Sequence, residues 1–174
     1  MKIKHTYSPE ETEILGYELG LLLKDEYKVV ILLDGDLGSG KTTFTKGIAR
    51  GIGVTEIVNS PTYTILKKYN TKDYRKVLYH LDLYRLDHVG DDFDLEEYID
   101  GQGMIVVEWP YKVSEFMPKD YLLVNIKKIN DTEREFTMTC VGIPCKRAVQ
   151  YIWKDCYLMY QPMWCMSDIQ KIIF

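Results

Sequence analysis

The fold is decided by one stretch of the chain, which starts at residue 29 and reads VVILLDGDLGSGKTTF up to residue 44. Its first five residues form a continuous apolar run with β-branched side chains, which favours a strand covered on both faces of a parallel sheet. The glycine-rich part that follows matches the pattern G-x-x-x-x-G-K-[ST] at every fixed position. Residues up to about 50 then suit a helix, which Gly51 and Gly53 can end. A strand, a glycine loop and a helix in this order predict a phosphate-binding loop, or P-loop.

The residue types in this loop suit phosphate chemistry. Glycines let backbone N–H groups approach phosphate oxygens closely, and the N-terminus of the next helix adds its positive dipole. We expect Lys41 to reach the β- and γ-phosphates, Thr42 to ligate Mg²⁺ and Thr43 to bond the α-phosphate. A merely structural glycine turn does not explain the Lys-Thr pair. The predicted nucleotide-binding residues are Gly35, Asp36, Leu37, Gly38, Ser39, Gly40, Lys41, Thr42 and Thr43.

Two acidic residues lie where a P-loop enzyme needs a carboxylate near its metal. Asp82 follows the strand-like run 77–81, and Glu108 follows the buried run 104–107. The carboxyl ends of parallel strands open onto the ligand crevice of such a sheet. We therefore assign Glu108 a metal-linked or water-orienting role and Asp82 a metal-binding or supporting role. The alternative for either residue is an ordinary solvated carboxylate.

A second loop is a candidate for a nucleotide-sensing switch. Ser60-Pro61-Thr62-Tyr63 lies downstream of the P-loop helix, where such switches often occur. The Thr62 hydroxyl could sense the γ-phosphate or Mg²⁺, and a plain proline-led turn is the alternative. Arg85 is a candidate for stabilising transferred charge. The guanine signature Asn-Lys-x-Asp is present only as letters in the wrong order at residues 70–73, which favours ATP.

The remaining pattern predicts an α/β P-loop NTPase fold of three layers, with a mostly parallel central sheet and a short late strand pair. Residues 2–7 suit a short strand, and Ser8 and Glu11 suit a capping box at the start of a helix. Further strands are expected at about 64–69 and in the runs preceding Asp82 and Glu108, with a helix at 91–98. Runs at 121–128 and 135–140 suit a hairpin.

Composition and length favour one compact domain. The chain has 174 residues, of which 46% are apolar, enough to bury a substantial core. We divide it into a P-loop ATPase domain at 1–143 and an atypical aromatic, Met- and Cys-rich tail at 144–174. The tail is expected to pack on the same domain as a surface helix, and an apolar docking surface for a partner is the alternative.

Charge and cysteine usage limit the class of protein. The formal net charge is -4 and the basic residues form no long cluster, which argues against strong unaided binding to nucleic acid. No secretory signal or membrane span is visible, so we expect a cytoplasmic protein. Cys140, Cys145, Cys156 and Cys165 form no Cys-x-x-Cys pair, and we expect free thiols rather than a zinc site.

Four segments together resemble the TsaE (YjeE) family, the bacterial ATPases needed to form threonylcarbamoyladenosine in tRNA. They are the P-loop at 35–43, SPTYT at 60–64, HLDLYRL at 80–86 and VEWP at 107–110. The resemblance covers roughly residues 7–142. It implies a P-loop fold that hydrolyses ATP with Mg²⁺ and acts with TsaD and TsaB, which install the group on the adenosine beside the anticodon. It also implies weak hydrolysis by the chain alone and contact with tRNA only through the complex.

The resemblance also implies roles for individual residues. Lys41, Thr42 and Thr43 correspond to nucleotide and metal ligands, Glu108 to the Walker B acid and Asp82 to a supporting metal residue. Thr62 falls in the switch-like segment. Glu11 and Thr12 fall where the N-terminal helix approaches the nucleotide, and Arg134 falls in the late strand pair; the resemblance implies that all three bind the cofactor. The tail matches no family motif, which leaves partner geometry and oligomeric state open.

Two other functions remain open from the residues alone. A small P-loop kinase would have this length, but such enzymes use several arginines to clamp phosphates and close a lid. This chain has five scattered arginines and no arginine-rich lid segment. A stand-alone nucleotide switch, whose product is a conformation, would share the same P-loop.

Overall fold

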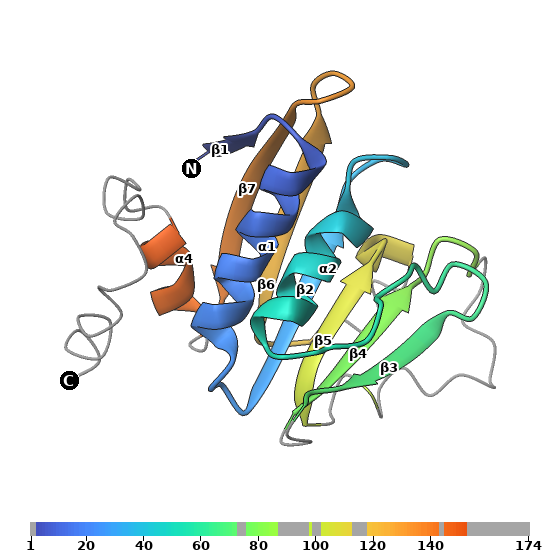
Figure 1. Cartoon of the computed structure of the whole chain (residues 1–174), viewed down its shortest axis with the longest axis vertical. Helices are drawn as coiled ribbons and strands as arrows, with labels where there is room; N and C mark the ends of the chain where they lie inside the picture. The colour runs from blue at the N-terminus through green and yellow to red at the C-terminus, as the bar shows by residue number, and fades with distance from the viewer. Residues whose placement is uncertain are drawn as a thin grey trace.

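A computed structural model of the chain describes residues 3–72, 76–86, 98, 102–112, 118–142 and 145–152. Its centre is a seven-stranded sheet in the order β1-β7-β6-β2-β5-β4-β3 (Figure 1). The strands are β1 (Ile3–Thr6), β2 (Lys28–Asp34), β3 (Leu66–Asn70), β4 (Val77–Asp82), β5 (Gly103–Glu108), β6 (Tyr121–Lys128) and β7 (Arg134–Val141). The helices are α1 (Pro9–Leu23), α2 (Lys41–Gly51) and α4 (Lys146–Ile152).

The centre of the sheet is parallel and its two sides are antiparallel. Strand β2 pairs in parallel with β5 and β6, and β4 pairs in parallel with β5. Strand β3 pairs antiparallel with β4, and β7 pairs antiparallel with β6 and β1. The predicted α/β class, the mostly parallel centre and the late strand pair β6–β7 are therefore confirmed.

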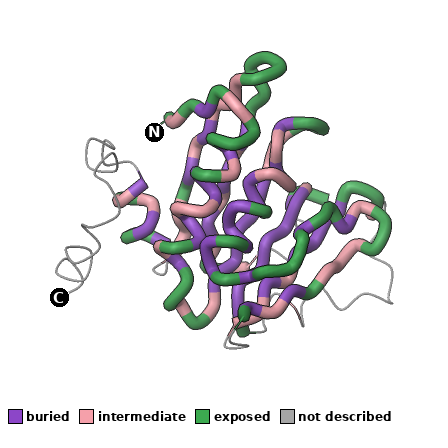
Figure 2. The backbone as a smooth tube through the Cα atoms, viewed as in Figure 1, coloured by how far each residue is buried: buried purple, intermediate pink, exposed green. Residues whose placement is uncertain are grey.

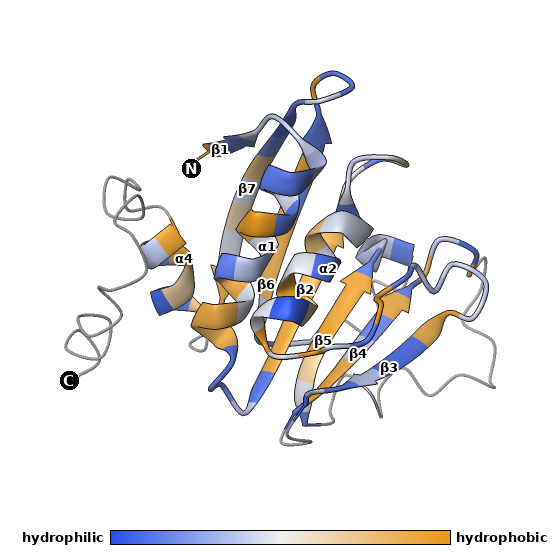
Figure 3. Ribbon diagram, viewed as in Figure 1, coloured by the Kyte–Doolittle hydropathy of each residue, from blue (hydrophilic) through white to orange (hydrophobic). Residues whose placement is uncertain are grey.

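Side-chain alternation divides the central strands between two apolar clusters. Ile31 of β2 and Val106 of β5 face one cluster, together with Phe44 and Ile48 of α2. Leu32 of β2 belongs to a second cluster on the opposite face. Both central strands are almost entirely buried (Figure 2) and strongly apolar (Figure 3), as a parallel strand covered on both faces must be.

Helices α1 and α2 lie against each other on one face of the sheet (Figure 1). Glycines allow this contact, because a Cβ atom at Gly16 would collide with the carbonyl oxygen of Phe44, and one at Gly47 with that of Glu13. Helix α4 shares the same apolar cluster through Ala148 and Ile152. All three described helices thus cover one face. The helix predicted at 91–98 lies outside the described residues except for its last residue.

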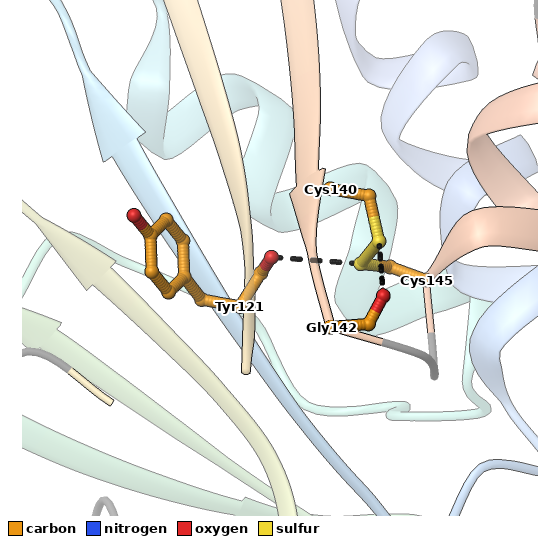
Figure 4. The surroundings of a disulfide bond; sticks show 4 residues. All are labelled: Tyr121, Cys140, Gly142 and Cys145. Atoms are coloured by element: carbon orange, nitrogen blue, oxygen red, sulfur yellow. Dashed lines mark hydrogen bonds between the residues drawn. A yellow bond between two sulfur atoms is a disulfide. The ribbon is translucent and has the colours of Figure 1, made fainter. Parts of the chain in front are cut away.

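The expectation of four free thiols is wrong for Cys140 and Cys145, which form a disulfide (Figure 4). Cys140 lies near the end of β7 and Cys145 directly precedes α4, so the turn brings their Cα atoms to 5.8 Å. Their sulfur atoms lie 3.6 Å from Gly142 O and 3.5 Å from Tyr121 O. Sequence reasoning missed this pair because it depends on how the chain turns back after β7. The other two cysteines lie outside the described residues.

The described part of the tail is short. Helix α4 buries Ala148 and Ile152 against the domain, and residues 153–174 lie outside the described part of the chain. Among the helices that are described, none combines the length and apolar character needed to cross a bilayer.

Candidate functional site

The P-loop joins the carboxyl end of β2 to the start of α2 at the parallel centre of the sheet. Gly38 and Gly40 adopt φ angles of 75° and 102°, a left-handed backbone that disfavours other residues. Gly40 is the N-cap of α2 and offers no side chain to bond the first N–H groups of the helix. These donors and the helix dipole can therefore serve an anionic ligand.

The Lys41 ammonium group is folded back onto the loop. Its Nζ donates hydrogen bonds to Gly35 O at 2.6 Å and Asp36 O at 3.0 Å, and lies 4.0 Å from the centre of the Trp109 ring. Burial lowers the pKa of Lys41, and the nearby carboxylates of Glu108, Asp82, Asp34 and Asp36 oppose this effect. The Lys41 ammonium group is thus hydrogen-bonded to the backbone of the loop that is predicted to bind phosphate.

The Glu108 carboxylate lies within hydrogen-bonding distance of side chains from two other elements. Its Oε1 accepts a hydrogen bond from Thr42 Oγ1 of α2 at 3.0 Å and lies 2.9 Å from His80 Nε2 of β4. Glu108 is 3% exposed and ends β5, beside the P-loop strand β2. Thr42 and Glu108, two residues predicted to serve the metal, are therefore in direct contact.

Asp82 stands beside Glu108 and connects to the switch-like loop. The two residues are register partners at the ends of β4 and β5. Asp82 Oδ2 accepts hydrogen bonds from Thr62 Oγ1 at 2.5 Å and from Ser60 Oγ at 3.2 Å, and its Oδ1 accepts one from Tyr84 N. The structure therefore brings Thr62 into contact with the predicted acid Asp82.

Arg134 braces the P-loop from its outer side. Its Nε donates to Ser39 O at 3.0 Å and its Nη2 to Gly38 O at 3.2 Å, while Nη1 donates to Asn130 O at 2.8 Å. The guanidinium group thus connects the β6–β7 turn to two carbonyl groups of the loop. Arg134 was predicted to bind the cofactor, and here its described contacts are to the loop backbone.

Thr12 and Glu11, the two residues of α1 that were predicted to bind the cofactor, differ in burial and in the groups that they contact. Thr12 is buried, and a Cβ atom at Gly40 would lie 3.7 Å from its Cγ2, so Thr12 flanks the P-loop. Glu11 is exposed and caps α1: its Oε2 accepts from Tyr7 N at 2.8 Å, and its N–H donates to Ser8 Oγ at 3.1 Å. In a capping box the Glu11 carboxylate would accept a hydrogen bond from the backbone N–H of the N-cap, Ser8. Here it accepts one from the preceding residue, Tyr7, instead.

Four further residues that the sequence singled out differ in their exposure and in their contacts. Leu37 is 76% exposed, whereas Ser39 is fully buried and its Oγ has no hydrogen-bond partner among the described residues. Thr43 is half-buried on α2. Arg85 stacks over the Tyr63 ring at 4.3 Å, so its described contact is not with the phosphate-binding loop.

Two residues at the site were not predicted as site residues. His80 is buried on β4 beside Glu108, and Trp109 covers Lys41 with a left-handed backbone angle of 61°. The sequence carried one usable signal for His80, because His80 and Asp82 are two residues apart and must face the same side of a strand. Trp109 gave no comparable signal, since its position depends on the turn after β5.

The donor atoms at this site suit Mg²⁺ better than a transition metal. They are the Thr42 hydroxyl and the carboxylates of Glu108 and Asp82. Mg²⁺ prefers oxygen ligands and is held by one or two carboxylates together with substrate phosphates. The described residues contain no group of three or more His, Cys, Asp or Glu side chains arranged to hold a metal by themselves.

A parallel sheet whose inner strand runs through a glycine loop into a helix, with a loop lysine and an acid on the adjacent strand, defines a P-loop protein. The profile of the family described as "Threonylcarbamoyl adenosine biosynthesis protein TsaE" matches residues 6–136. The chain therefore belongs to the TsaE family.

Individual proteins agree with this assignment. The TsaE protein of Bacillus subtilis, described as a tRNA threonylcarbamoyladenosine biosynthesis protein, is 47% identical over 79% of this chain and 84% of its own. The protein of the same description from Treponema pallidum is 37% identical over 75% and 95%. The crystal structure of YdiB from Bacillus subtilis matches with a TM-score of 0.71 and 39% identity, covering 86% of this chain and 95% of that one.

Proposed function

We propose that this chain binds Mg-ATP and hydrolyses it as a component of the machinery that forms threonylcarbamoyladenosine in tRNA, acting with TsaD and TsaB. The observation that carries the proposal is the contact between Thr42 of the P-loop helix and Glu108 of the adjacent strand, with Lys41 beside them. Its relatives of 37–47% identity carry the name of this pathway. A net charge of -4 suits a component that meets tRNA through its partners in the cytoplasm.

In this proposal, the described hydrogen bonds are the ones that a bound nucleotide would replace. Lys41 exchanges the carbonyl oxygens of Gly35 and Asp36 for phosphate oxygens, because phosphate carries full negative charge and carbonyl groups do not. With Mg²⁺ bound, Thr42 would offer it the hydroxyl oxygen that now faces Glu108, and the Glu108 carboxylate would hold a water molecule at the site. A bound Mg²⁺ neutralises charge that develops on the phosphates.

Thr62 and Asp82 are the residues that would link nucleotide state to partner docking. Thr62 lies between the buried Pro61 and the exposed Tyr63, and its hydroxyl is held by the buried carboxylate of Asp82. If Asp82 supports the metal, binding of Mg-ATP changes the partner of Thr62 and with it the conformation of the loop. The isolated chain is expected to hydrolyse ATP slowly, as P-loop proteins do when a partner completes the site.

The test is ATP hydrolysis by the purified chain, alone and with TsaD and TsaB, in the native form and as Lys41→Ala. Lys46→Ala is the matched control, because Lys46 is exposed on the same helix. We expect partners to stimulate phosphate release, and Lys41→Ala but not Lys46→Ala to abolish it. Absence of Mg-ATP binding by the native chain would refute the proposal. Transfer of phosphate to a small acceptor would favour a kinase, and ATP-dependent partner binding with unstimulated turnover would favour a switch.

A further inference from the structure

His80 is a buried polar residue that the roles assigned above do not use. It lies on β4 between Leu78 and Asp82, on the sheet face that α2 covers, and is 0% exposed. Leu78 belongs to the apolar cluster of that face. A strand position of this kind is usually apolar, and burying an imidazole there disfavours folding unless the ring makes compensating hydrogen bonds.

Within the described residues, the buried His80 ring makes one hydrogen bond. His80 Nε2 lies 2.9 Å from Glu108 Oε1, and a carboxylate oxygen only accepts, so Nε2 carries the hydrogen. The other ring nitrogen, Nδ1, is buried and has no hydrogen-bond partner among the described residues. An apolar side chain would fill this position without leaving a nitrogen unpaired, so core packing alone does not explain His80.

The oxygen that His80 holds is also the oxygen that Thr42 holds. Thr42 Oγ1 donates to the same Oε1 at 3.0 Å. When Thr42 turns toward a metal and phosphates, that donor leaves the carboxylate. His80 is then the described donor that stays on Glu108, and it comes from the inner strand β4 rather than from the start of α2, where Thr42 lies.

We propose that His80 is a positioning residue, whose Nε2–H fixes the Glu108 carboxylate in the orientation that serves the Mg-nucleotide once Thr42 has turned away. This inference rests on the proposed function. Groups that orient a metal-linked ligand typically change metal affinity or activity by about 10–100-fold when they are removed. His80 therefore acts on the Mg²⁺-dependent part of nucleotide binding and on turnover, and leaves Mg²⁺-free binding to the P-loop backbone and Lys41.

Three substitutions separate this role from core packing. His80→Gln places an amide nitrogen near the position of Nε2 and can keep the bond to Glu108. His80→Asn places its nitrogen near Nδ1 and cannot reach that oxygen, although it is also polar. His80→Leu removes the donor and fills the space. His5→Gln is the matched control, since His5 lies on strand β1 and pairs with Glu133 and Glu135.

The measurements are the dissociation constant of a fluorescent ADP analogue with and without Mg²⁺, partner-stimulated turnover, and the thermal midpoint of each variant. For His80→Leu and His80→Asn we expect the Mg²⁺-dependent gain in affinity and kcat to fall by about 10-fold or more. Their Mg²⁺-free affinity stays within about twofold of the native value, as does every value of His5→Gln. His80→Gln is expected to recover most of both losses.

The outcomes distinguish this inference from the proposed function. If the native chain shows Mg²⁺-dependent binding and the Leu and Asn variants keep it in full, His80 is not a positioning residue. The inference also fails if His80→Gln is as impaired as His80→Leu, or if the losses follow the thermal midpoint alone. If the native chain itself binds no Mg-nucleotide, the proposed function fails first and the inference falls with it.

Discussion

Arg134→Met is expected to weaken nucleotide binding although the described contacts of Arg134 are to the protein backbone. The native guanidinium group donates to the carbonyl groups of Gly38 and Ser39 and so helps to turn the loop N–H groups toward the ligand side. Methionine keeps much of the side-chain volume and removes every donor. The loop must then be ordered by the nucleotide itself, which lowers the affinity.

The size of the effect follows from the two bonds to the loop. A hydrogen bond from a charged donor contributes about 1.5–3 kcal/mol when it is fully buried. Arg134 is half-buried and water can replace it at the carbonyl groups, so about 1 kcal/mol for each bond is the appropriate value. The total of about 2 kcal/mol corresponds to about a 30-fold rise in Kd. Arg134→Lys offers one point charge instead of a fork and should lose about fivefold.

The assay is titration of ATP and ADP by calorimetry at a temperature well below the unfolding midpoint of each variant. Arg50→Met is the matched control, because Arg50 is exposed on α2 and bonds Glu13 rather than the loop. The reasoning is refuted if Arg134→Met binds nucleotide as tightly as the native chain. It is equally refuted if Arg50→Met loses as much affinity, since the effect would then be one of net charge.

Three further predictions concern stability. Lys76 Nζ donates hydrogen bonds to three backbone carbonyl groups at the end of α1. Lys76→Met should therefore lower the free energy of unfolding by about 1.5 kcal/mol and Tm by about 3–6 °C. An unchanged Tm would contradict this. Reducing the Cys140–Cys145 disulfide, whose residues are 5 apart, should lower stability by about 2 kcal/mol in denaturant titrations, with no response to reductant in Cys140→Ala. Burial raises the pKa of Glu18 above 4.5, and the nearby Lys4 opposes this shift. The native state therefore favours the protonated carboxyl group, and the contribution of this group to stability is lost as pH rises through the folded pKa. Glu18→Gln should therefore gain stability relative to the native chain between about pH 4 and pH 7, and a difference independent of pH would rule this out.

The P-loop and its flanking elements could be predicted because their signals are local. The pattern that ends at Lys41 and Thr42 lies within eight residues, and the apolar run before it specifies a strand by composition alone. Helix α1 likewise begins at Pro9 after the Ser8 cap, as its sequence indicated. Glu108 could be placed beside the P-loop because parallel strands end at the same edge of a sheet.

The contacts between distant segments could not be predicted in the same way. The bond from His80 to Glu108 requires β4 to lie directly beside β5, and the sequence does not specify the order of strands. Arg134 reaches the loop because β6 pairs with β2, which brings the β6–β7 turn next to Ser39. Alternation specifies the face of a strand but leaves its neighbours open.

If the site binds Mg-ATP as proposed, it must exchange internal hydrogen bonds for bonds to its ligand, and this exchange would limit its affinity. Lys41 leaves two loop carbonyl groups and the Trp109 ring, and Thr42 leaves Glu108, before either can bind phosphate or metal. Each new bond therefore contributes only its excess over the bond that it replaces. A partner that stabilises the exchanged state would add to affinity and turnover together. The same geometry thus leads us to expect weak hydrolysis by the chain alone and stimulation by TsaD and TsaB, and the Lys41→Ala comparison with and without these partners tests both.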